Sequence, residues 1–230
     1  MDDCTRDVFI ITSVLNTGAM PWSYTRTRSV YTCQQRYEQT LKSIQSIRDL
    51  NDSTFIVLSE CSEISTEMTE ELRSRVDLFV QSYDNETIRN ACINSIKKGY
   101  GEVLQSIAAV DALNQIKITF RRMFKLSGRY FLNNYFDKNN FSLELYTFNK
   151  MFKLSTAHST VLYSVPYDLM EAYMDVLSDC VKLYEHKVIG LEEILPPRCK
   201  PATYIDCYGA SGYVAVDNSF FSPTPADVYG

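Results

Sequence analysis

The chain has 230 residues, of which 45% are hydrophobic and 22% charged, and 28 acidic against 23 basic side chains give a formal net charge of −5. This composition excludes a disordered or collagen-like chain, and the acidic balance argues against a dedicated nucleic-acid binder. No apolar run is longer than Val8 to Ile11, so we expect no membrane span, and the acidic start lacks the apolar segment of a secretory signal. Seven cysteines without zinc-type spacing indicate reduced thiols in a cytoplasmic protein.

The first half alternates segments typical of buried strands and amphipathic helices. Thr32 and Gln35 have the spacing of a capping box at the start of the first helix. In chain order, the patterns predict a strand over 8–15, a helix over 32–47, a strand over 55–58, a helix over 68–75, a strand over 78–80, a helix over 103–113 and a strand over 120–126. This order predicts a mainly parallel sheet with helices on both faces.

The second half is less regular and predicts a mixed α+β arrangement. Strands are expected over 143–152 and 160–165, and a short strand over 213–216. Asp168 and Glu171 repeat the capping-box spacing before a long amphipathic helix. Because no linker is visible, we expect one domain over 1–230 that ends in a flexible tail over 223–230.

Ligands of open α/β sheets bind beyond the carboxyl ends of the strands, so the segments after the predicted strands are the candidates for a site. The long loop over 16–31 carries Trp22, Tyr24 and Arg28, which suit a ligand with a ring and a phosphate. A surface loop with its aromatic side chains folded inward is the alternative. After the second strand, Glu60 could hold a ribose hydroxyl or cap the next helix.

The end of the fourth strand is the most informative segment. Lys125 lies in an apolar strand, where its charge must be paired or reach solvent. Gly128 permits close backbone approach, and Arg129 could grip a phosphate through parallel hydrogen bonds. A structural salt bridge beneath a turn is the alternative for this segment.

Several common catalytic motifs are missing from the sequence. It contains no G-x-x-x-x-G-K-[S/T] loop, no glycine-rich turn after the first strand, no H-E-x-x-H and no G-x-S-x-G. These absences argue against P-loop NTPases, classical dehydrogenases, zinc proteases and serine hydrolases.

Three blocks together resemble a known group of proteins: 27–48, 125–130 and 190–196. Their order and spacing are similar to those of the glycosyltransferase-like proteins of large DNA viruses, phages and bacterial surface-polysaccharide clusters. The resemblance implies a GT-A-like fold, with a nucleotide-sugar-binding half over 1–132 and an acceptor-side half over 133–222. It also implies a nucleotide-sugar donor and a glycan or other hydroxyl acceptor.

The resemblance also implies roles for individual residues. GT-A enzymes usually place an Asp-x-Asp motif for the metal and diphosphate at the end of the fourth strand, but Ser127-Gly128-Arg129 stands there, and Asp-x-Asp occurs nowhere in the chain. Metal is therefore not expected to be required, although assistance by Mn²⁺ or Mg²⁺ stays open. Gly190-Leu191-Glu192-Glu193 is similar to the acidic motif that supplies a general base, and Glu193 aligns better with its second acid. The alternative is that these glutamates decorate the first turn of a short helix.

The sequence therefore predicts a nucleotide-sugar-dependent glycosyltransferase. A GT-A-like protein that binds nucleotide or glycan without catalysis is the first alternative, because Asp-x-Asp is missing. A nucleotidyltransferase or methyltransferase is the second. The expected general base is Glu192 or Glu193, and the expected donor-binding residues are Thr12, Ser13, Arg28, Glu60, Lys125, Ser127, Gly128 and Arg129.

Overall fold

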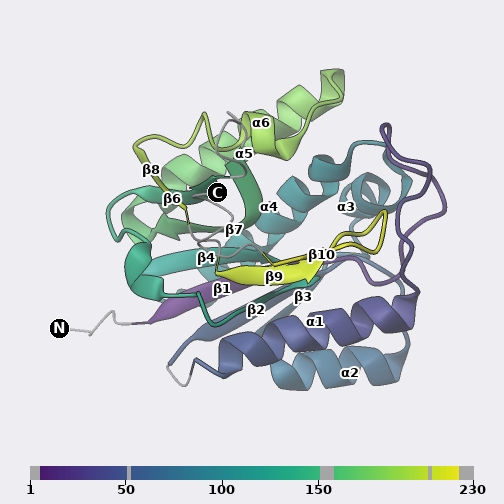
Figure 1. The fold of residues 1–230 in the computed structure, drawn as a ribbon, viewed down its shortest axis with the longest axis horizontal. Coiled ribbons are helices and arrows are strands. Elements are labelled where there is room, and N and C mark those ends of the chain that lie inside the picture. The colour runs from purple at the N-terminus through teal and green to yellow at the C-terminus, as the bar shows by residue number, and fades with distance from the viewer. Residues whose placement is uncertain (1–5, 51–52, 151–157, 207–208, 223–230) are drawn as a thin grey trace.

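A seven-stranded, mostly parallel sheet forms the centre of the computed structural model, which describes residues 6–50, 53–150, 158–206 and 209–222 (Figure 1). The strand order is β3-β2-β1-β4-β7-β6-β8, and only β7 runs against the others. The strands are β1 (Asp7–Ser13), β2 (Phe55–Glu60), β3 (Leu78–Gln81), β4 (Arg122–Ser127), β6 (Tyr146–Lys150), β7 (His158–Pro166) and β8 (Ala202–Ile205). The predicted α/β class and parallel front half are confirmed.

Helices cover both faces of this sheet. One face is covered by α1 (Cys33–Arg48) and α2 (Thr66–Arg75), and the other by α4 (Lys98–Ile116), α5 (Met170–His186) and α6 (Leu191–Ile194) (Figure 1). The short α3 (Glu86–Arg89) and a π-helical turn over Asn90–Asn94 precede α4. Thr32 caps α1, and its capping box with Gln35 is present as predicted.

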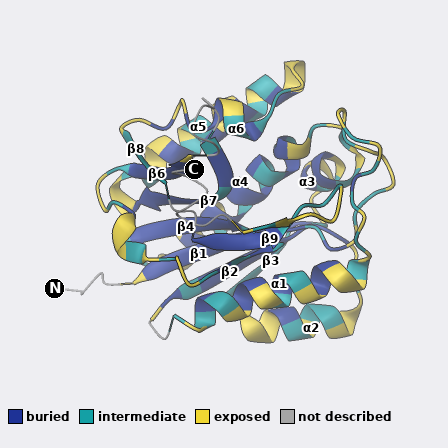
Figure 2. Ribbon diagram, in the orientation of Figure 1, coloured by how far each residue is buried: buried dark blue, intermediate teal, exposed yellow. Residues whose placement is uncertain are grey.

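Two apolar cores lie between these layers. Every residue of β1 is buried, because the strand is covered on both faces (Figure 2). Val8 and Ile10 belong to the core beneath α4 and α5, whereas Phe9 and Ile11 belong to the core beneath α1. This alternation is what a continuous apolar run produces in a strand, so the run that predicted β1 also explains why the layers hold together.

A second, three-stranded sheet lies against the α1 side. It contains β5 (Tyr130–Leu132), β9 (Ala210–Tyr213) and β10 (Phe220–Phe221), in the order β10-β9-β5. Tyr130, Leu132 and Ala210 contribute to the core beneath α1. The strand predicted over 213–216 lies earlier in the chain than expected. β9 ends at Tyr213, because it pairs with β5 through residues 210–212 and the chain then turns back to form β10.

Three further expectations need comment. The capping box at Asp168 and Glu171 was wrong: Asp168 lies in a 3₁₀ turn over Tyr167–Leu169, and α5 has no side-chain cap. The strand predicted over 143–152 is shorter, since β6 begins at Tyr146, and residues 151–152 lie outside the described residues, as does the tail over 223–230. In the part of the chain that the structure describes, no helix is long and apolar enough to cross a membrane.

Candidate functional site

A cavity of about 240 Å³ lies where the parallel strands β1 and β4 end. Pairing of Thr12 with Ser127 places the two strand ends side by side. Because β7 is antiparallel, its N-terminal part lies at this same edge, and its residues Thr160 and Val161 line the cavity too. The loop over 214–216 closes another side. The position is the one at which open α/β sheets bind ligands.

The turn after β4 forms the floor of the cavity. The amide of Gly128 donates to the Thr12 carbonyl oxygen over 3.0 Å, and the Thr40 hydroxyl donates to the Gly128 carbonyl oxygen over 3.0 Å. Thr40 also shares a hydrogen bond of 3.2 Å with Ser13. A Cβ atom at position 128 would lie only 3.0 Å from the Thr12 carbonyl oxygen, so this close approach favours glycine. The turn therefore holds Ser127 and Arg129 at the cavity.

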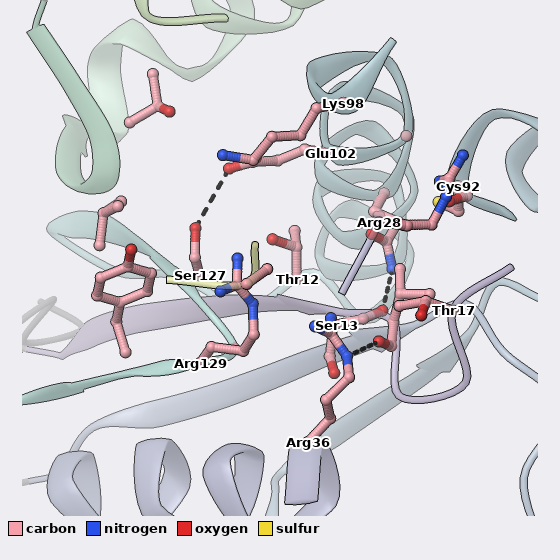
Figure 3. Close-up of a pocket in the computed structure, with 18 of the residues that line it drawn as sticks. Thr12, Ser13, Thr17, Arg28, Arg36, Cys92, Lys98, Glu102, Ser127 and Arg129 are labelled. Atoms are coloured by element: carbon pink, nitrogen blue, oxygen red, sulfur yellow. Dashed lines mark hydrogen bonds between the residues drawn. The ribbon is translucent and has the colours of Figure 1, made fainter. Parts of the chain in front are cut away.

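Two arginines point into the cavity, Arg36 from α1 and Arg129 from the end of β4 (Figure 3). Arg36 donates through Nε to the Val14 carbonyl oxygen over 2.6 Å, and Arg129 donates through Nη1 to the Tyr213 carbonyl oxygen. Burial, together with the charge of Arg129, lowers the pKa of Arg36 to about 9. Burial also lowers the pKa of Arg129.

No carboxylate of the described residues forms an ion pair with either guanidinium. Glu60 acts on Arg36 electrostatically, but burial raises the pKa of Glu60 and so favours its neutral form. Two partly desolvated guanidinium groups that repel one another and keep free donors make a site for an anion. A planar guanidinium also suits the oxygen pairs of a phosphate.

Beneath the cavity, Lys125 is fully buried and forms an ion pair with Glu102 of α4. Its ammonium also donates to Ser127 Oγ over 2.9 Å and to the Thr160 carbonyl oxygen over 3.2 Å. Burial lowers the pKa of Lys125 well below its usual value, whereas the contact with Glu102 favours the charged form. Lys125 does not line the cavity, so it cannot contact a ligand there directly.

The two glutamates of α6 differ in position. Glu192 lines the cavity and accepts a hydrogen bond of 3.2 Å from the Thr160 hydroxyl. Glu193 is exposed and lines a neighbouring cavity but not this one. Glu193 aligns better with the acidic motif of the proteins that the sequence resembles. The structure nevertheless places Glu192, and not Glu193, at the cavity that Arg36 and Arg129 line. Glu192 is therefore the better candidate base.

Arg28 lines the cavity and Glu60 lies close to it, but both have other partners. The Arg28 side chain is 2% exposed, donates to three carbonyl oxygens, those of Met20, Cys92 and Ser95, and lies 3.7 Å above the ring of Trp22. Each of its three nitrogens thus donates to a carbonyl oxygen and helps to hold the loop over 16–31, which leaves at most two of its five N–H groups for a phosphate.

Glu60 is completely buried and does not line the cavity. Its Oε1 atom accepts from the Leu15 amide over 3.0 Å and from the Ser62 hydroxyl. The carboxyl therefore fixes the chain after β1, and its complete burial away from the cavity keeps it from a ribose bound there. Of the predicted donor-binding residues, those that line the cavity are Thr12, Ser13, Arg28, Ser127, Gly128 and Arg129.

Three residues of the site were not singled out from the sequence: Arg36, Lys98 and Glu102. All three come from helices, and Figure 3 shows Lys98 and Glu102 projecting from α4 toward Ser127. Helical spacing could have placed them on one face of a helix, but not at a strand edge. Trp22 and Tyr24 of the predicted loop complete the wall.

The residues at the cavity do not fit a divalent cation. In the described ranges, no three His, Cys, Asp or Glu side chains come together as a metal site requires. The two carboxylates that line the cavity are Glu102, which is paired with Lys125, and Glu192, which is bonded to Thr160. Mn²⁺ and Mg²⁺ take several oxygen ligands, whereas this cavity presents positively charged side chains where those oxygen ligands would have to lie.

Comparison with solved structures identifies the architecture. The apo form of the glycosyltransferase GlyE of Streptococcus pneumoniae TIGR4 matches 88% of this chain and 45% of its own, with 11% identity and a TM-score of 0.54. A second GlyE structure matches 87% and 45%, with 10% identity and a TM-score of 0.50. The fold is GT-A-like. The predicted fold is thus confirmed, and this chain spans less than half the length of those glycosyltransferases.

A glycosyltransferase involved in the glycosylation of the major capsid of PBCV-1 matches 86% of this chain and 81% of its own, with 12% identity. Its TM-score of 0.40 is too low to support a conclusion about fold. No family model matches the sequence, and no curated protein matches it either. Identities this low carry the fold alone, so the chemistry of this chain must be argued from its own residues.

Proposed function

We propose that the protein is a glycosyltransferase that moves a sugar from a nucleotide-sugar donor to a hydroxyl group of a glycan or similar acceptor. The observation that carries this proposal is the pair Arg36 and Arg129, which share one cavity at the strand ends and have no carboxylate partner among the described residues. A nucleoside diphosphate supplies the anion that such a pair needs. The GT-A-like fold agrees with this choice.

In this proposal the donor lies along the strand ends. The diphosphate contacts Arg36 and Arg129, and the nucleoside lies toward Thr12, Ser13 and the aromatic loop. When the bond from the anomeric carbon to the diphosphate breaks, negative charge grows on the leaving oxygen. Fixed guanidinium groups stabilise that charge without reorganising, which is the largest electrostatic contribution in many enzymes.

Glu192 is the proposed general base. A sugar hydroxyl is a poor nucleophile at neutral pH, and a placed carboxylate typically accelerates its reaction 10²–10⁴-fold. The acceptor oxygen forms a bond to the anomeric carbon, its proton passes to Glu192, and the nucleoside diphosphate leaves with the bonding electrons. The Thr160 hydroxyl, 3.2 Å from Glu192, holds the carboxylate in place for this step.

The test is thermal unfolding of the wild type with nucleoside diphosphates and nucleotide sugars, followed by transfer assays with the nucleotide that binds. A ligand at a hundred times its Kd stabilises by about 2.7 kcal/mol. Arg129→Ala should abolish this shift and keep the fold, whereas Arg73→Ala, on the exposed face of α2, should bind normally. A normal shift in Arg129→Ala would remove that arginine from the site.

The transfer assays separate catalysis from binding alone. Glu192→Gln should bind the donor normally but transfer sugar at least about 100-fold more slowly. Saturable donor binding by the wild type without transfer to any acceptor in a broad panel would instead favour a non-catalytic nucleotide- or glycan-binding protein, the alternative that the missing Asp-x-Asp motif suggests.

A further inference from the structure

A second cavity opens beside the first. It is lined by Lys97, Gly99, Ile189 and Glu193, among others, and it shares Tyr24, Lys98, Glu102 and Glu192 with the first cavity. The shared residues therefore mark the junction between the two. Under the proposed function, the diphosphate lies on one side of this junction, and the acceptor must approach from the other to reach Glu192. The transferred sugar then has to occupy the junction itself.

Glu102 lies at this junction with a fixed position. Its side chain is 17% exposed, while that of its ion-pair partner Lys125 is 1% exposed. Lys125 is held in turn by Ser127 Oγ and by the Thr160 carbonyl oxygen. A buried cation that is bonded on three sides leaves the carboxylate little freedom to move.

Only one oxygen of Glu102 is used by the protein within the described residues. The ion pair with Lys125 and the 3.4 Å hydrogen bond from Ser127 Oγ both involve Oε1. The second oxygen is left for a ligand. An ionised carboxylate that is held in place accepts hydrogen bonds from hydroxyl groups strongly, because bonds to charged acceptors are about twice as strong as neutral ones.

A purely structural pair would not need this arrangement. Burying Lys125 costs free energy, and an apolar pair of similar volume is often as stable or more stable. The pair places a charged hydrogen-bond acceptor on the wall of two cavities, which an apolar residue could not provide. Hydrogen bonds to the hydroxyl groups of a ligand would then offset the free energy that burying Lys125 costs.

We propose that Glu102 binds hydroxyl groups of the donor sugar, and that Lys125 is the positioning residue that holds Glu102 for this contact. The inference rests on the proposed function and adds to it the residue that recognises the donor sugar. It predicts that the wild type binds a nucleotide sugar more tightly than the corresponding nucleoside diphosphate, and that Glu102 supplies most of the difference.

The experiment measures two dissociation constants for each variant by calorimetry, one for the nucleoside diphosphate and one for its nucleotide sugar. Glu102→Gln should weaken nucleotide-sugar binding by about 10- to 150-fold, the range for losing a hydrogen bond to a charged group, and leave the diphosphate constant within about threefold. Glu185→Gln, an equal charge change on the exposed face of α5, should alter neither constant.

Lys125→Met tests the positioning role. It should lower the preference for the nucleotide sugar as Glu102→Gln does, and the double variant should lose no more than either single variant. A general disturbance of the cavity would weaken both ligands together, and that result would overturn the inference.

The other outcomes are also decisive. If the wild type binds both ligands equally, or if Glu102→Gln still binds the nucleotide sugar more tightly than the diphosphate, Glu102 does not recognise the donor sugar. The proposed function stands in either case. If no nucleotide binds to the folded wild type, the proposed function is wrong, and so is this inference, which rests on it.

Discussion

Replacing Gly99 by alanine should force α4 and α5 apart. A Cβ atom at this position would lie 2.0 Å from Tyr184 Oη and 2.9 Å from Leu191 Cβ, and ordinary contact begins at 3.4 Å. Tyr184 is fully buried, so its ring cannot swing aside. Overpacking of this kind costs about 1–3 kcal/mol, and the better helix propensity of alanine returns about 1 kcal/mol at most. We expect the free energy of unfolding to fall by about 1–2 kcal/mol.

Tyr184→Phe provides the test of this reasoning. The Tyr184 hydroxyl is buried and has no hydrogen-bond partner in the described residues, so its removal should be neutral or stabilising by up to about 1 kcal/mol. In the double variant the shortest clash is gone, and part of the loss should be recovered, because the Cβ atom still lies 2.9 Å from Tyr184 Cζ and from Leu191 Cβ. Urea unfolding of all four proteins gives the coupling energy, which should be at least about 0.5 kcal/mol. Strictly additive effects would show that Gly99 and Tyr184 do not collide.

Two further changes test individual elements. Burial raises the pKa of Glu60, so its proton is held more tightly in the folded than in the unfolded state, and the stability that this proton contributes below the ordinary carboxyl pKa is lost as the pH rises through the raised value. Glu60→Gln should therefore gain stability relative to the wild type as the pH rises above the ordinary carboxyl pKa, and parallel pH profiles of the urea midpoints would contradict this. Thr32→Ala removes the side chain that accepts from the Gln35 amide at the start of α1, and should cost about 1 kcal/mol in thermal unfolding; an unchanged Tm would mean that another group caps the helix.

Local patterns predicted every strand of the central sheet except the edge strand β8, which was not expected from the sequence. The run from Val8 is apolar on both sides of the strand because helices cover both faces, and such runs are read directly from sequence. The capping box at Thr32 was also predicted correctly, because both of its residues lie within one helical turn and the pattern is local. At Asp168 the same spacing misled, because the preceding chain forms a 3₁₀ turn that moves the helix start to Met170.

The small sheet and half of the site depend on contacts that no local pattern reveals. The short strand β5 pairs with β9, far along the chain, and neither carries an alternation long enough to notice. Arg28 has the side chain expected of a phosphate ligand, but each of its three nitrogens already donates to a carbonyl oxygen of the fold. Arg36 sits on a helix, and only the fold shows that its guanidinium meets Arg129 at the strand ends.

The pairing of β5 with β9 has a consequence for how the protein matures. Tyr130 pairs with Gly212, and the residues just beyond, 214–216, close the cavity that Arg36 and Arg129 enter. The cavity is therefore incomplete until residues 210–216 have been synthesised and β9 has paired with β5. Contacts between segments so distant in sequence form late, because the intervening loop must first be closed. A nucleotide added during refolding should thus leave the early steps unchanged and act on the last one, the docking of β9.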